Sequence, residues 1–373
     1  MEAREASLGS RTLGNTSGLV DFSSNDYLGF ARNETLFSKT FQLLLSANIA
    51  HNGATGSRLV SGNHPLYADL ELLLAQFHRA ESALVFNSGY DANIGFFGAV
   101  PQRNDVVLHD AHVHASIRDG MAMGRAKCVK FEHNDLLDLQ KKHAGLKDAL
   151  HGDSTVYVVT EAVFSMDGDT PDLAALAAFC KDTGALLVVD EAHAVGVLGQ
   201  RGEGLVPSLG LEDEVFARTV TFGKALGAHG AAVLGSKALV QYLVNFARSF
   251  IYTTALAPHT LATILAAYQH LQAEGAKEMF CLRENMDFFE QKMAAEKLTH
   301  HFVGSSSAIR ACLVPGNAKV LKLSGMLRDQ GFDVKAMRAP TVPEGSERLR
   351  FCLHSTNGKE EIGLVLQLLS KFL

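Results

Sequence analysis

The 373-residue chain lacks the cysteine spacings and the long apolar runs that mark several protein classes. Its five cysteines are scattered, odd in number and never spaced as CxxC, which argues against a disulfide framework or a zinc site. No run of 18 apolar residues occurs, and the first residues are polar without a hydrophobic signal region. We therefore expect a protein of the reducing cytosol, with neither a membrane span nor a secretion signal.

An excess of basic charge and the phosphate loop of nucleotide-binding proteins are also absent. The 34 basic and 40 acidic residues give a net charge of −6, and no basic cluster is interleaved with aromatic residues, so nucleic-acid binding is not indicated. The loop GxxxxGK(S/T) occurs nowhere in the chain. Small molecules are the expected substrates.

The chain does contain a regular alternation of apolar strands and helices. Nearly continuous apolar runs at 156–161 and 185–190 are typical of parallel strands that are covered on both faces. Among the helices, apolar periodicity predicts one at about 135–150 and one at 238–252. A smaller α+β unit closes the chain.

The length exceeds what one simple core usually holds, so we expect two closely connected domains. The large, ligand-binding domain is expected at 41–260 and the small domain at 261–373. An N-terminal segment, 1–40, is expected to pack with the small domain.

A single lysine, Lys224, stands among the small residues of the stretch 220–232, between two apolar strands. Glycines let another backbone or a ring approach closely, and a desolvated lysine is a nucleophile. Imine formation suits such a residue, and the aldehyde of pyridoxal phosphate is its commonest partner. A lone lysine in a glycine-rich turn is also typical of a solvated loop, so this prediction needs support from other residues.

Two glycine-containing segments are candidates for binding anions. The turn Asn-Ser-Gly-Tyr at 87–90 joins a short apolar strand to a helix, and the free backbone N–H groups at a helix start favour a phosphate. The turn is too short for the dinucleotide fingerprint GxGxxG. The loop 53–62 lies between two expected helices and carries Arg58, a candidate for an anionic ligand, although a mobile connector has the same composition.

Three histidines and an aspartate lie at the end of an expected strand, within 109–114. They would suit a metal ion, but no further ligand with zinc spacing is near. They would equally suit the polar edge of a strand. A third interpretation is that one imidazole stacks on a flat aromatic cofactor, because ligands bind at the carboxyl ends of strands in open α/β sheets.

An acid, Asp190, ends a buried strand, where an unpaired charge is costly. A protonated pyridine nitrogen would supply a cationic partner and would act as an electron sink. The sequence Asp-Glu-Ala-His at 190–193 also matches the DEAH box of nucleic-acid helicases, but that box works with a Walker A loop, which this chain lacks. Nor does His193 form the HExxH pairing of zinc enzymes.

Six segments, in order, carry a resemblance to the α-oxoamine synthase family of pyridoxal-phosphate (PLP) enzymes: 22–29, 56–62, 160–169, 190–193, 221–224 and 340–345. The similarity runs from about Phe22 to the C-terminus. It implies an α/β fold of the PLP-dependent aminotransferase-like type (fold type I), with a mostly parallel central sheet flanked by helices and a smaller α+β C-terminal domain. The segment before Phe22 is shorter than in the family, which leaves recognition of the acyl carrier open.

The resemblance also implies roles for single residues. Lys224 would hold the cofactor as an imine, Asp190 would pair with the pyridinium nitrogen, His193 would hydrogen-bond the phenolic oxygen, and His114 would stack on the ring. The other expected cofactor contacts are Ser88, Gly89, Tyr90, Glu161, Ser165 and Thr221, with Thr253 and Thr254 reaching the phosphate of the neighbouring subunit in a homodimer. The expected substrate contacts are Asn25, Arg58, Thr341 and Arg350.

Arg350 is expected to hold the carboxylate of an amino acid, because a guanidinium binds a carboxylate in a planar fork. Strand alternation places Arg348 on the same face, so periodicity does not select between the two, and the family motif favours Arg350. An exposed edge strand with two solvating arginines is the alternative.

The likeness is greatest to the family members of biotin biosynthesis, which implies decarboxylative condensation of L-alanine with a pimeloyl thioester of coenzyme A or of acyl-carrier protein. A hydrophobic pocket discriminates one methyl group by about 1–3 kcal/mol, so glycine is a near rival. The alternatives are glycine with an acetyl or succinyl thioester, serine with a palmitoyl thioester, a same-fold aminotransferase, and a non-catalytic subunit. A succinyl group would need a cation in its pocket, which Arg58 could supply.

Overall fold

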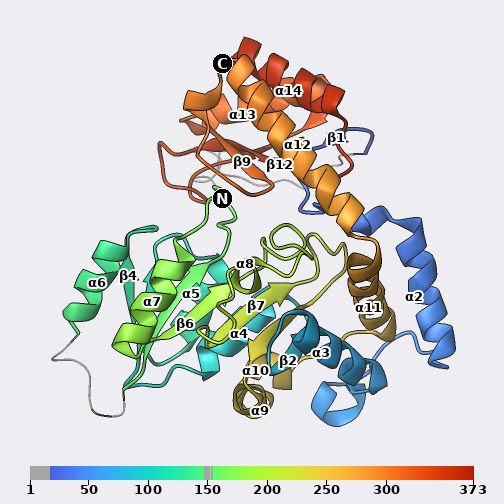
Figure 1. The fold of residues 1–373 in the computed structure, drawn as a ribbon, viewed down its shortest axis with the longest axis vertical. Coiled ribbons are helices and arrows are strands. Elements are labelled where there is room, and N and C mark those ends of the chain that lie inside the picture. The colour runs from blue at the N-terminus through green and yellow to red at the C-terminus, as the bar shows by residue number, and fades with distance from the viewer. Residues whose placement is uncertain (1–16, 147–151, 153) are drawn as a thin grey trace, which may run out of the picture. The chain divides into compact units, whose positions relative to one another are not determined.

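The computed structural model describes residues 17–146, 152 and 154–373, which form two compact units (Figure 1). Unit 1 comprises the chain up to Gly29, Ser165–Asp169 and Ala276–Leu373. Unit 2 comprises Phe30–Phe164 and Thr170–Gly275.

This division differs from the expected boundaries at residues 40 and 260. Helices α2 (Glu34–Ser46) and α11 (Pro258–Ala273) contact each other, and both belong to unit 2. The first 16 residues of the expected N-terminal segment lie outside the described residues.

A seven-stranded sheet forms the centre of unit 2, in the order β2-β8-β7-β6-β5-β3-β4. Strand β8 pairs antiparallel with β2 and β7, and the other neighbours pair parallel, so the sheet is mostly parallel, as the sequence predicts. Strands β3, β5 and β6 are almost entirely buried, as expected for strands covered on both faces. The strands are β2 (Ser82–Phe86), β3 (Val106–Asp110), β4 (Lys127–Phe131), β5 (Val156–Glu161), β6 (Leu186–Asp190), β7 (Ala217–Thr221) and β8 (Ala231–Gly235).

Helices flank this sheet on both faces (Figure 1). On one face, α4, α5 and α9 share an apolar core with the strands, in which Phe96, Ile117 and Leu243 are buried. Several helices begin at a side-chain cap, which satisfies an N–H group of the first turn: Asn33 caps α2, Ser88 caps α4 and Asp172 caps α7. The remaining helices are α3 (Pro65–Phe77), α4 (Gly89–Ala99), α5 (Ala115–Met123), α6 (Leu136–Ala144), α7 (Leu173–Thr183), α8 (Leu205–Ser208), α9 (Lys237–Phe246) and α10 (Arg248–Ile251).

The helix expected at 238–252 is interrupted. Ala247 adopts an extended conformation and separates α9 from α10. Ala247 is fully buried, and the Ser249 hydroxyl donates to the Asp91 carbonyl of α4 at 2.6 Å. Packing of α10 on α4 therefore outweighs continuation of the helix. The end of the helix expected at 135–150 lies outside the described residues.

The expected loop 53–62 contains one helical turn, η2 (Arg58–Gly62). Three backbone N–H groups, those of Val60, Ser61 and Gly62, all donate to the Ser57 carbonyl at 2.9–3.2 Å. Single-sequence periodicity cannot detect one such turn, because it is shorter than a repeat of the apolar pattern.

Unit 1 is the smaller α+β part predicted from the sequence. Its antiparallel sheet has the order β11-β12-β9, and β1 pairs parallel with β10. Helix α14 contacts both α12 and α13 (Figure 1). The elements are β1 (Val20–Asp21), α12 (Ala276–Ala295), β9 (Ile309–Leu313), α13 (Asn317–Asp329), β10 (Phe332–Asp333), β11 (Lys335–Met337), β12 (Arg348–Cys352) and α14 (Lys359–Phe372).

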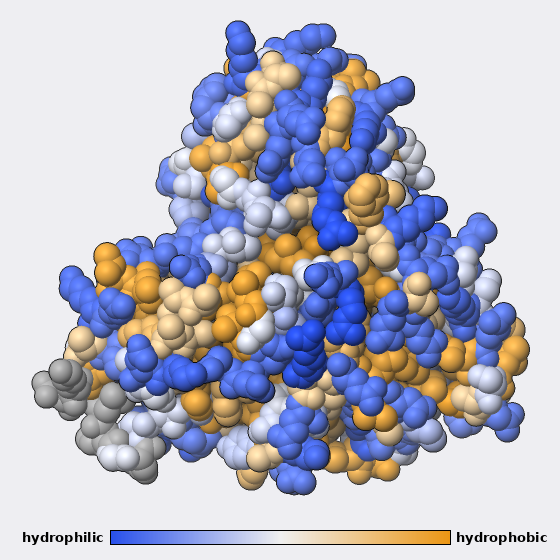
Figure 2. Space-filling view, in the orientation of Figure 1, coloured by the Kyte–Doolittle hydropathy of each residue, from blue (hydrophilic) through white to orange (hydrophobic). Residues whose placement is uncertain are grey.

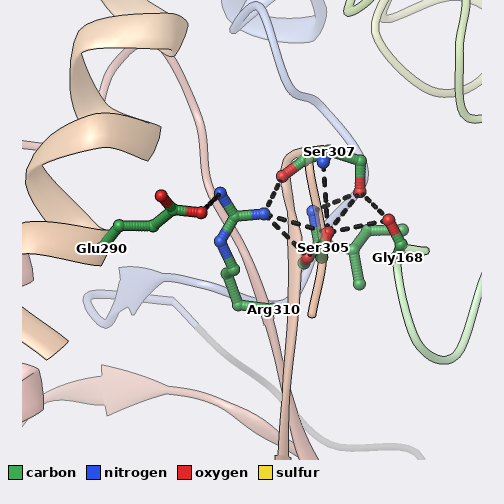
Figure 3. A network of polar contacts seen from close by, with 6 residues as sticks. Gly168, Glu290, Ser305, Ser307 and Arg310 are labelled. Atoms are coloured by element: carbon green, nitrogen blue, oxygen red, sulfur yellow. Dashed lines mark hydrogen bonds and ion pairs between the residues drawn. The ribbon is translucent and has the colours of Figure 1, made fainter. Parts of the chain in front are cut away.

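The segment Ser165–Asp169 follows β5 in the chain but belongs to unit 1 (Figure 3). The hydroxyls of Ser305 and Ser307 donate to the Gly168 carbonyl at 2.7 and 2.8 Å, and Arg310 donates to both serines. Gly168 has φ +78°, and a Cβ there would lie 2.4 Å from the Ile309 carbonyl oxygen, so this approach requires glycine. The segment is thus fixed to the sheet of unit 1.

Candidate functional site

The sheet register brings the predicted residues of unit 2 to one edge. Ala231 is the register partner of both Phe86 and Thr221, so the turns after β2 and β7 start at the same level. Asp190 pairs in register with Glu161 on one side and with Thr219 on the other. The carboxyl ends of β2, β5, β6 and β7 therefore form one row, which is where ligands bind in open α/β sheets.

Lys224 lies in the turn that connects β7 to β8 and is partly buried. The turn is closed by backbone hydrogen bonds from Gly227 to the Lys224 carbonyl (2.9 Å) and from Ala228 to the Phe222 carbonyl (2.8 Å). Gly227 has φ +59°, and a Cβ there would lie 2.1 Å from the Ala31 nitrogen. The tight turn holds the backbone of Lys224 in place.

Asp190 and Glu161 are buried acids that end neighbouring parallel strands. Asp190 accepts from the Ala192 N–H at 2.9 Å and from the Asn93 amide at 2.8 Å. Glu161 accepts from the His114 N–H at 2.6 Å. Burial raises the pKa of Glu161 well above its ordinary range, and the charge of Asp190 adds to this effect, while Lys224 opposes it. Glu161, Asp190, Lys224 and His114 therefore interact electrostatically and form one cluster.

His114 caps the start of α5, because its Nδ1 accepts from the Ser116 N–H at 3.2 Å. His114 is exposed to solvent. Desolvation by the surrounding chain nevertheless lowers the pKa of His114, an effect that Asp190 opposes and Lys224 strengthens. At neutral pH the ring is therefore uncharged.

The start of α4 is the predicted anion site. Ser88 is the N-cap, and its hydroxyl accepts from the Asp91 N–H at 3.0 Å. A Cβ on Gly89 would lie 2.7 Å from Thr221 Cγ2, so glycine allows the α4 start and the end of β7 to approach closely. The Tyr90 hydroxyl donates to Asp119 at 2.6 Å, which holds this side chain against α5.

His193 is buried in the turn that follows β6. The Thr221 hydroxyl donates to the Ala192 carbonyl at 3.3 Å, which ties this turn to the end of β7. Asp190, His193, Thr221 and Lys224 thus come from two adjacent strand ends.

Two further predicted sites of unit 2 are occupied by contacts within the chain. Arg58 donates to both carboxylate oxygens of Glu71 and to Asn63, and its guanidinium lies 3.8 Å from the Tyr67 ring centroid. An anion would have to compete with Glu71 for Arg58. The Thr253 hydroxyl accepts from the Asn87 amide at 2.9 Å, next to the Ser88 turn of the same chain.

Contacts within the chain involve the polar residues of 109–114, for which a metal ion was one of three interpretations. Asp110 accepts from the His112 N–H at 2.7 Å and lies 2.9 Å from His133 Nδ1, and the rings of His112 and His133 stack with centroids 3.9 Å apart. Within residues 17–146, 152 and 154–373, no three His, Cys, Asp or Glu side chains are arranged to hold a metal ion.

In unit 1 the two arginines of β12 have different partners. Arg348 forms a buried ion pair with Asp167. Arg350 is equally buried, and it donates to the Ser165 carbonyl (2.6 Å), to Asn25 Oδ1 (3.1 Å) and to the Cys352 sulfur (2.9 Å). Among the described residues, no carboxylate contacts Arg350.

The predicted residues Asn25, Ser165 and Arg350 thus form one group in unit 1, through the Arg350 side chain. Thr341 is exposed, and its N–H donates to the Arg338 carbonyl at 2.8 Å. The alternative of an exposed edge strand with two solvating arginines is wrong, because β12 is the central strand of its sheet and is buried throughout.

Sequence reasoning missed three buried polar residues below the site: Asn93, Ser116 and Thr219. Asn93 bonds to Asp190, to Ser116 and to Thr219. The available signal was an asparagine among the apolar residues of an expected helix, since a buried amide must find partners.

The family model for class I and II aminotransferases matches residues 17–365. The chain belongs to this family. Its curated relatives include 8-amino-7-oxononanoate synthases from Emericella nidulans, 40% identical with 96% of this chain and 90% of the relative covered, and from Geotalea daltonii, 40% identical with 91% and 84% covered.

Solved structures with the same fold include serine palmitoyltransferase from Sphingomonas wittichii, with TM-score 0.88, 28% identity, and 95% of this chain and 87% of that chain covered. The 8-amino-7-oxononanoate synthase of Francisella tularensis has TM-score 0.77 and 29% identity, with 95% and 97% covered. Another serine palmitoyltransferase structure contains PLP. The fold class and the family resemblance predicted from the sequence are confirmed.

Among the described residues, every helix is too short or too polar to cross a membrane.

Proposed function

We propose that this chain is a PLP-dependent acyltransferase that condenses L-alanine with a pimeloyl thioester in biotin biosynthesis. The products are 8-amino-7-oxononanoate, carbon dioxide and a free thiol. The observation that carries the proposal is 40% identity, over nearly the whole chain, to 8-amino-7-oxononanoate synthases. The pimeloyl group arrives on coenzyme A or on acyl-carrier protein.

The side chains of unit 2 fit PLP. The α4 start offers backbone N–H groups to a phosphate, and Gly89 keeps the approach open. Asp190 offers a carboxylate to the pyridinium nitrogen, and Lys224 offers an amine to the aldehyde. His193 would hydrogen-bond the phenolic oxygen, and His114 would stack on the ring. Ser88, Tyr90, Glu161 and Thr221 would make the remaining contacts from unit 2. The family resemblance adds Ser165, which belongs to unit 1. When bound, PLP supplies an electron sink for negative charge at the α-carbon of the amino acid.

Four side chains, those of Lys224, Asp190, Glu161 and His114, have different roles in proton transfer and charge balance. Lys224 would hold the cofactor covalently, and its Nζ would accept the α-proton of the amino acid. Asp190 keeps the ring nitrogen protonated. Burial and the charge of Asp190 raise the pKa of Glu161, which favours its protonated form and so limits the negative charge beside Asp190. His114 is neutral, so it adds no positive charge against the ring.

Arg350 holds the carboxylate of alanine. Its contacts with Asn25, Ser165 and Cys352 orient the guanidinium but do not neutralise it. Arg348 is already paired with Asp167 and cannot serve a second carboxylate equally well. A buried cation without an acid partner is costly, and a substrate carboxylate would remove this cost.

The active protein is a homodimer in which Thr253 and Thr254 reach the neighbouring phosphate. The surface beside them supports this: Tyr252 is 73% exposed, and Val60 of η2, which contacts α10, is 84% exposed. Helix α2 also exposes apolar side chains on one face, at Phe37, Phe41 and Leu45. Figure 2 shows apolar side chains at the surface of unit 2 where Figure 1 places α2. Apolar surface of this extent is typical of an interface.

We place the reaction in the cytoplasm, where free cysteines such as Cys128, which is exposed, stay reduced.

Thiol release tests the substrate assignment. The protein, loaded with PLP, is mixed with alanine, glycine or serine and with pimeloyl, acetyl, succinyl or palmitoyl thioesters. Alanine with the pimeloyl thioester should give the highest kcat/KM. Lys224→Ala is the inactive control, and Lys237→Ala, which removes an exposed lysine, is the matched active control.

Three outcomes would contradict the assignment. Preference for glycine with acetyl or succinyl, or for serine with palmitoyl, would leave the cofactor chemistry standing and overturn the substrates. Transfer of the amino group from alanine to an oxo acid, without any thioester, would identify an aminotransferase. Absence of both reactions in PLP-loaded protein would overturn the enzyme proposal.

A further inference from the structure

A chain of hydrogen bonds links Asp190 to His114 through the interior of unit 2. Asn93 donates its amide to Asp190 Oδ2 at 2.8 Å and to Ser116 Oγ at 3.0 Å, and Ser116 Oγ lies 2.7 Å from His114 Nδ1. Thr219 Oγ1 lies 3.1 Å from Asn93 Oδ1. The exposed fractions of Asn93, Ser116 and Thr219 are 2%, 0% and 4%, so water cannot replace these partners.

The acid at one end sets the orientation of the Asn93 amide. An ionised carboxylate only accepts hydrogen bonds, so the amide nitrogen of Asn93, not its oxygen, must face Asp190. The Asn93 oxygen then faces Thr219, which donates to it. The second amide hydrogen points to Ser116, whose oxygen accepts it, and the Ser116 hydroxyl hydrogen is left to donate to His114 Nδ1.

The backbone adds a second donor to the same ring nitrogen. The Ser116 N–H, at 3.2 Å from His114 Nδ1, caps α5 through this atom. A ring nitrogen that accepts hydrogen bonds carries no proton. Desolvation also keeps the ring neutral, as the lowered pKa of His114 indicates. A neutral imidazole has one proton, and here it resides on Nε2.

We infer that Asn93 and Ser116 are positioning residues that transmit the charge of Asp190 to His114 and hold its ring as the Nε2–H tautomer. The role of this tautomer in catalysis rests on the proposed function, in which His114 and Asp190 flank the cofactor. The Nε2–H group is then a donor for a carboxylate or a thioester carbonyl oxygen above the ring. The Nδ1–H tautomer would present an acceptor there and would repel both.

The tautomer can be measured on the protein without PLP. Nuclear magnetic resonance of isotope-labelled histidine distinguishes Nε2–H from Nδ1–H through the two ring nitrogens, and His114→Gln assigns the signal. The wild-type chain should show His114 as Nε2–H. Asn93 makes no direct hydrogen bond to His114. Asn93→Leu should nevertheless raise the ratio of the Nδ1–H to the Nε2–H tautomer of His114 by about five- to tenfold, the effect of one lost hydrogen bond.

Ser116→Ala removes the donor itself and should shift the ratio in the same direction by at least as much. Thr219→Val keeps the shape of its β-branched side chain and frees the Asn93 amide to turn, so it should give a smaller shift of the same sign. Ser249→Ala is the matched control, because Ser249 also bonds to α4, at the Asp91 carbonyl, but is not part of the chain. It should leave the ratio unchanged.

Circular dichroism verifies the fold of each variant. If Asn93→Leu does not fold, Thr219→Val decides. An unchanged His114 ratio in the folded variant of Asn93 or Thr219 would overturn the inference, as would a wild-type ring with its proton on Nδ1. Thiol release by the same PLP-loaded wild-type preparation tests the proposed function separately, so the two can fail independently.

Discussion

Two consecutive acids at the end of β6 meet different surroundings. Asp190 lies at the sheet edge and accepts from the neutral Asn93 amide and a backbone N–H. Glu191 points into the interior, where its carboxylate lies 3.6 Å from the Arg218 guanidinium and accepts from the Val206 N–H. The chain therefore neutralises one acid internally and orients the other with uncharged groups.

The two arginines of β12 repeat this contrast in unit 1. Arg348 is neutralised by Asp167, whereas Arg350 is oriented by an amide, a carbonyl and a thiol. In each pair, the residue with an internal counter-charge serves the fold. The residue held by neutral groups keeps its charge available for a ligand.

The largest expected effect is on Lys224, the residue that we propose carries the chemistry. Lys224→Ala should abolish condensation while the melting temperature stays near that of the wild type, because Lys224 lies in a turn closed by backbone bonds. Thiol release and thermal unfolding measure the two properties. Near-normal thiol release by this variant would remove Lys224 from the site.

Substitutions of the two acids at the end of β6 should affect different properties, activity for Asp190 and stability for Glu191. Asp190→Asn should still bind PLP and fold, but it should lower kcat by about 10²- to 10⁴-fold, because a neutral amide no longer favours a protonated pyridine. Glu191→Gln leaves Arg218 buried and unpaired, and should cost about 3–5 kcal/mol in the free energy of unfolding. Urea unfolding and steady-state kinetics compare them. Equal losses of kcat in both variants would refute the contrast.

Substitutions of the two arginines of β12 should likewise affect different properties, substrate binding for Arg350 and stability for Arg348. Arg350→Gln should raise KM for alanine by about 10- to 100-fold, since a charge-assisted hydrogen bond contributes about 1.5–3 kcal/mol. Arg348→Gln should mainly destabilise the fold, because it leaves Asp167 buried without its cation. If Arg348→Gln raised KM more than Arg350→Gln, the carboxylate would belong to Arg348.

The interior cluster also predicts a dependence of stability on pH. His78 is fully buried, with Tyr268 and the Glu203 carbonyl as hydrogen-bond partners, and burial lowers its pKa to about 3, with the Arg218 charge adding to the effect. The folded-state pKa lies below the unfolded value of about 6.5, so the neutral ring stabilises the fold fully above pH 6.5.

This stabilisation is lost as the pH falls from about 6.5 towards 3, with a total of about 5 kcal/mol from His78 alone. Urea unfolding at pH 7, 5 and 4 (roughly the window set by these pKa values) measures the slope. His78→Gln should unfold more easily at pH 7 but show a shallower slope. An unchanged slope would mean that another group controls acid unfolding.

The sequence predicted the parts of the site that follow from local pattern. Lys224 and Asp190 were proposed because residue type and strand end coincide, and the α4 start because a small-residue turn precedes a helix. Strand periodicity could not predict which of Arg348 and Arg350 holds the substrate carboxylate. It depends on Asp167, which lies 181 residues away in the chain.

The features that the sequence did not predict also depend on tertiary contacts. Asn93 has no motif, and its meaning appears only when Asp190, Ser116 and Thr219 surround it. The break at Ala247 arises from packing on α4, which propensity does not record. The domain boundaries shifted because α2 and α11, more than 200 residues apart, pack together.

The central claim is that this chain attaches PLP through Lys224, and one measurement tests it most directly. The purified protein is incubated with PLP, reduced with borohydride, digested and mapped by mass spectrometry. The account predicts a visible absorbance band before reduction and a pyridoxyl label on Lys224 afterwards, with Lys237 unlabelled. A colourless protein, or a label on any other lysine with Lys224 unmodified, would contradict it.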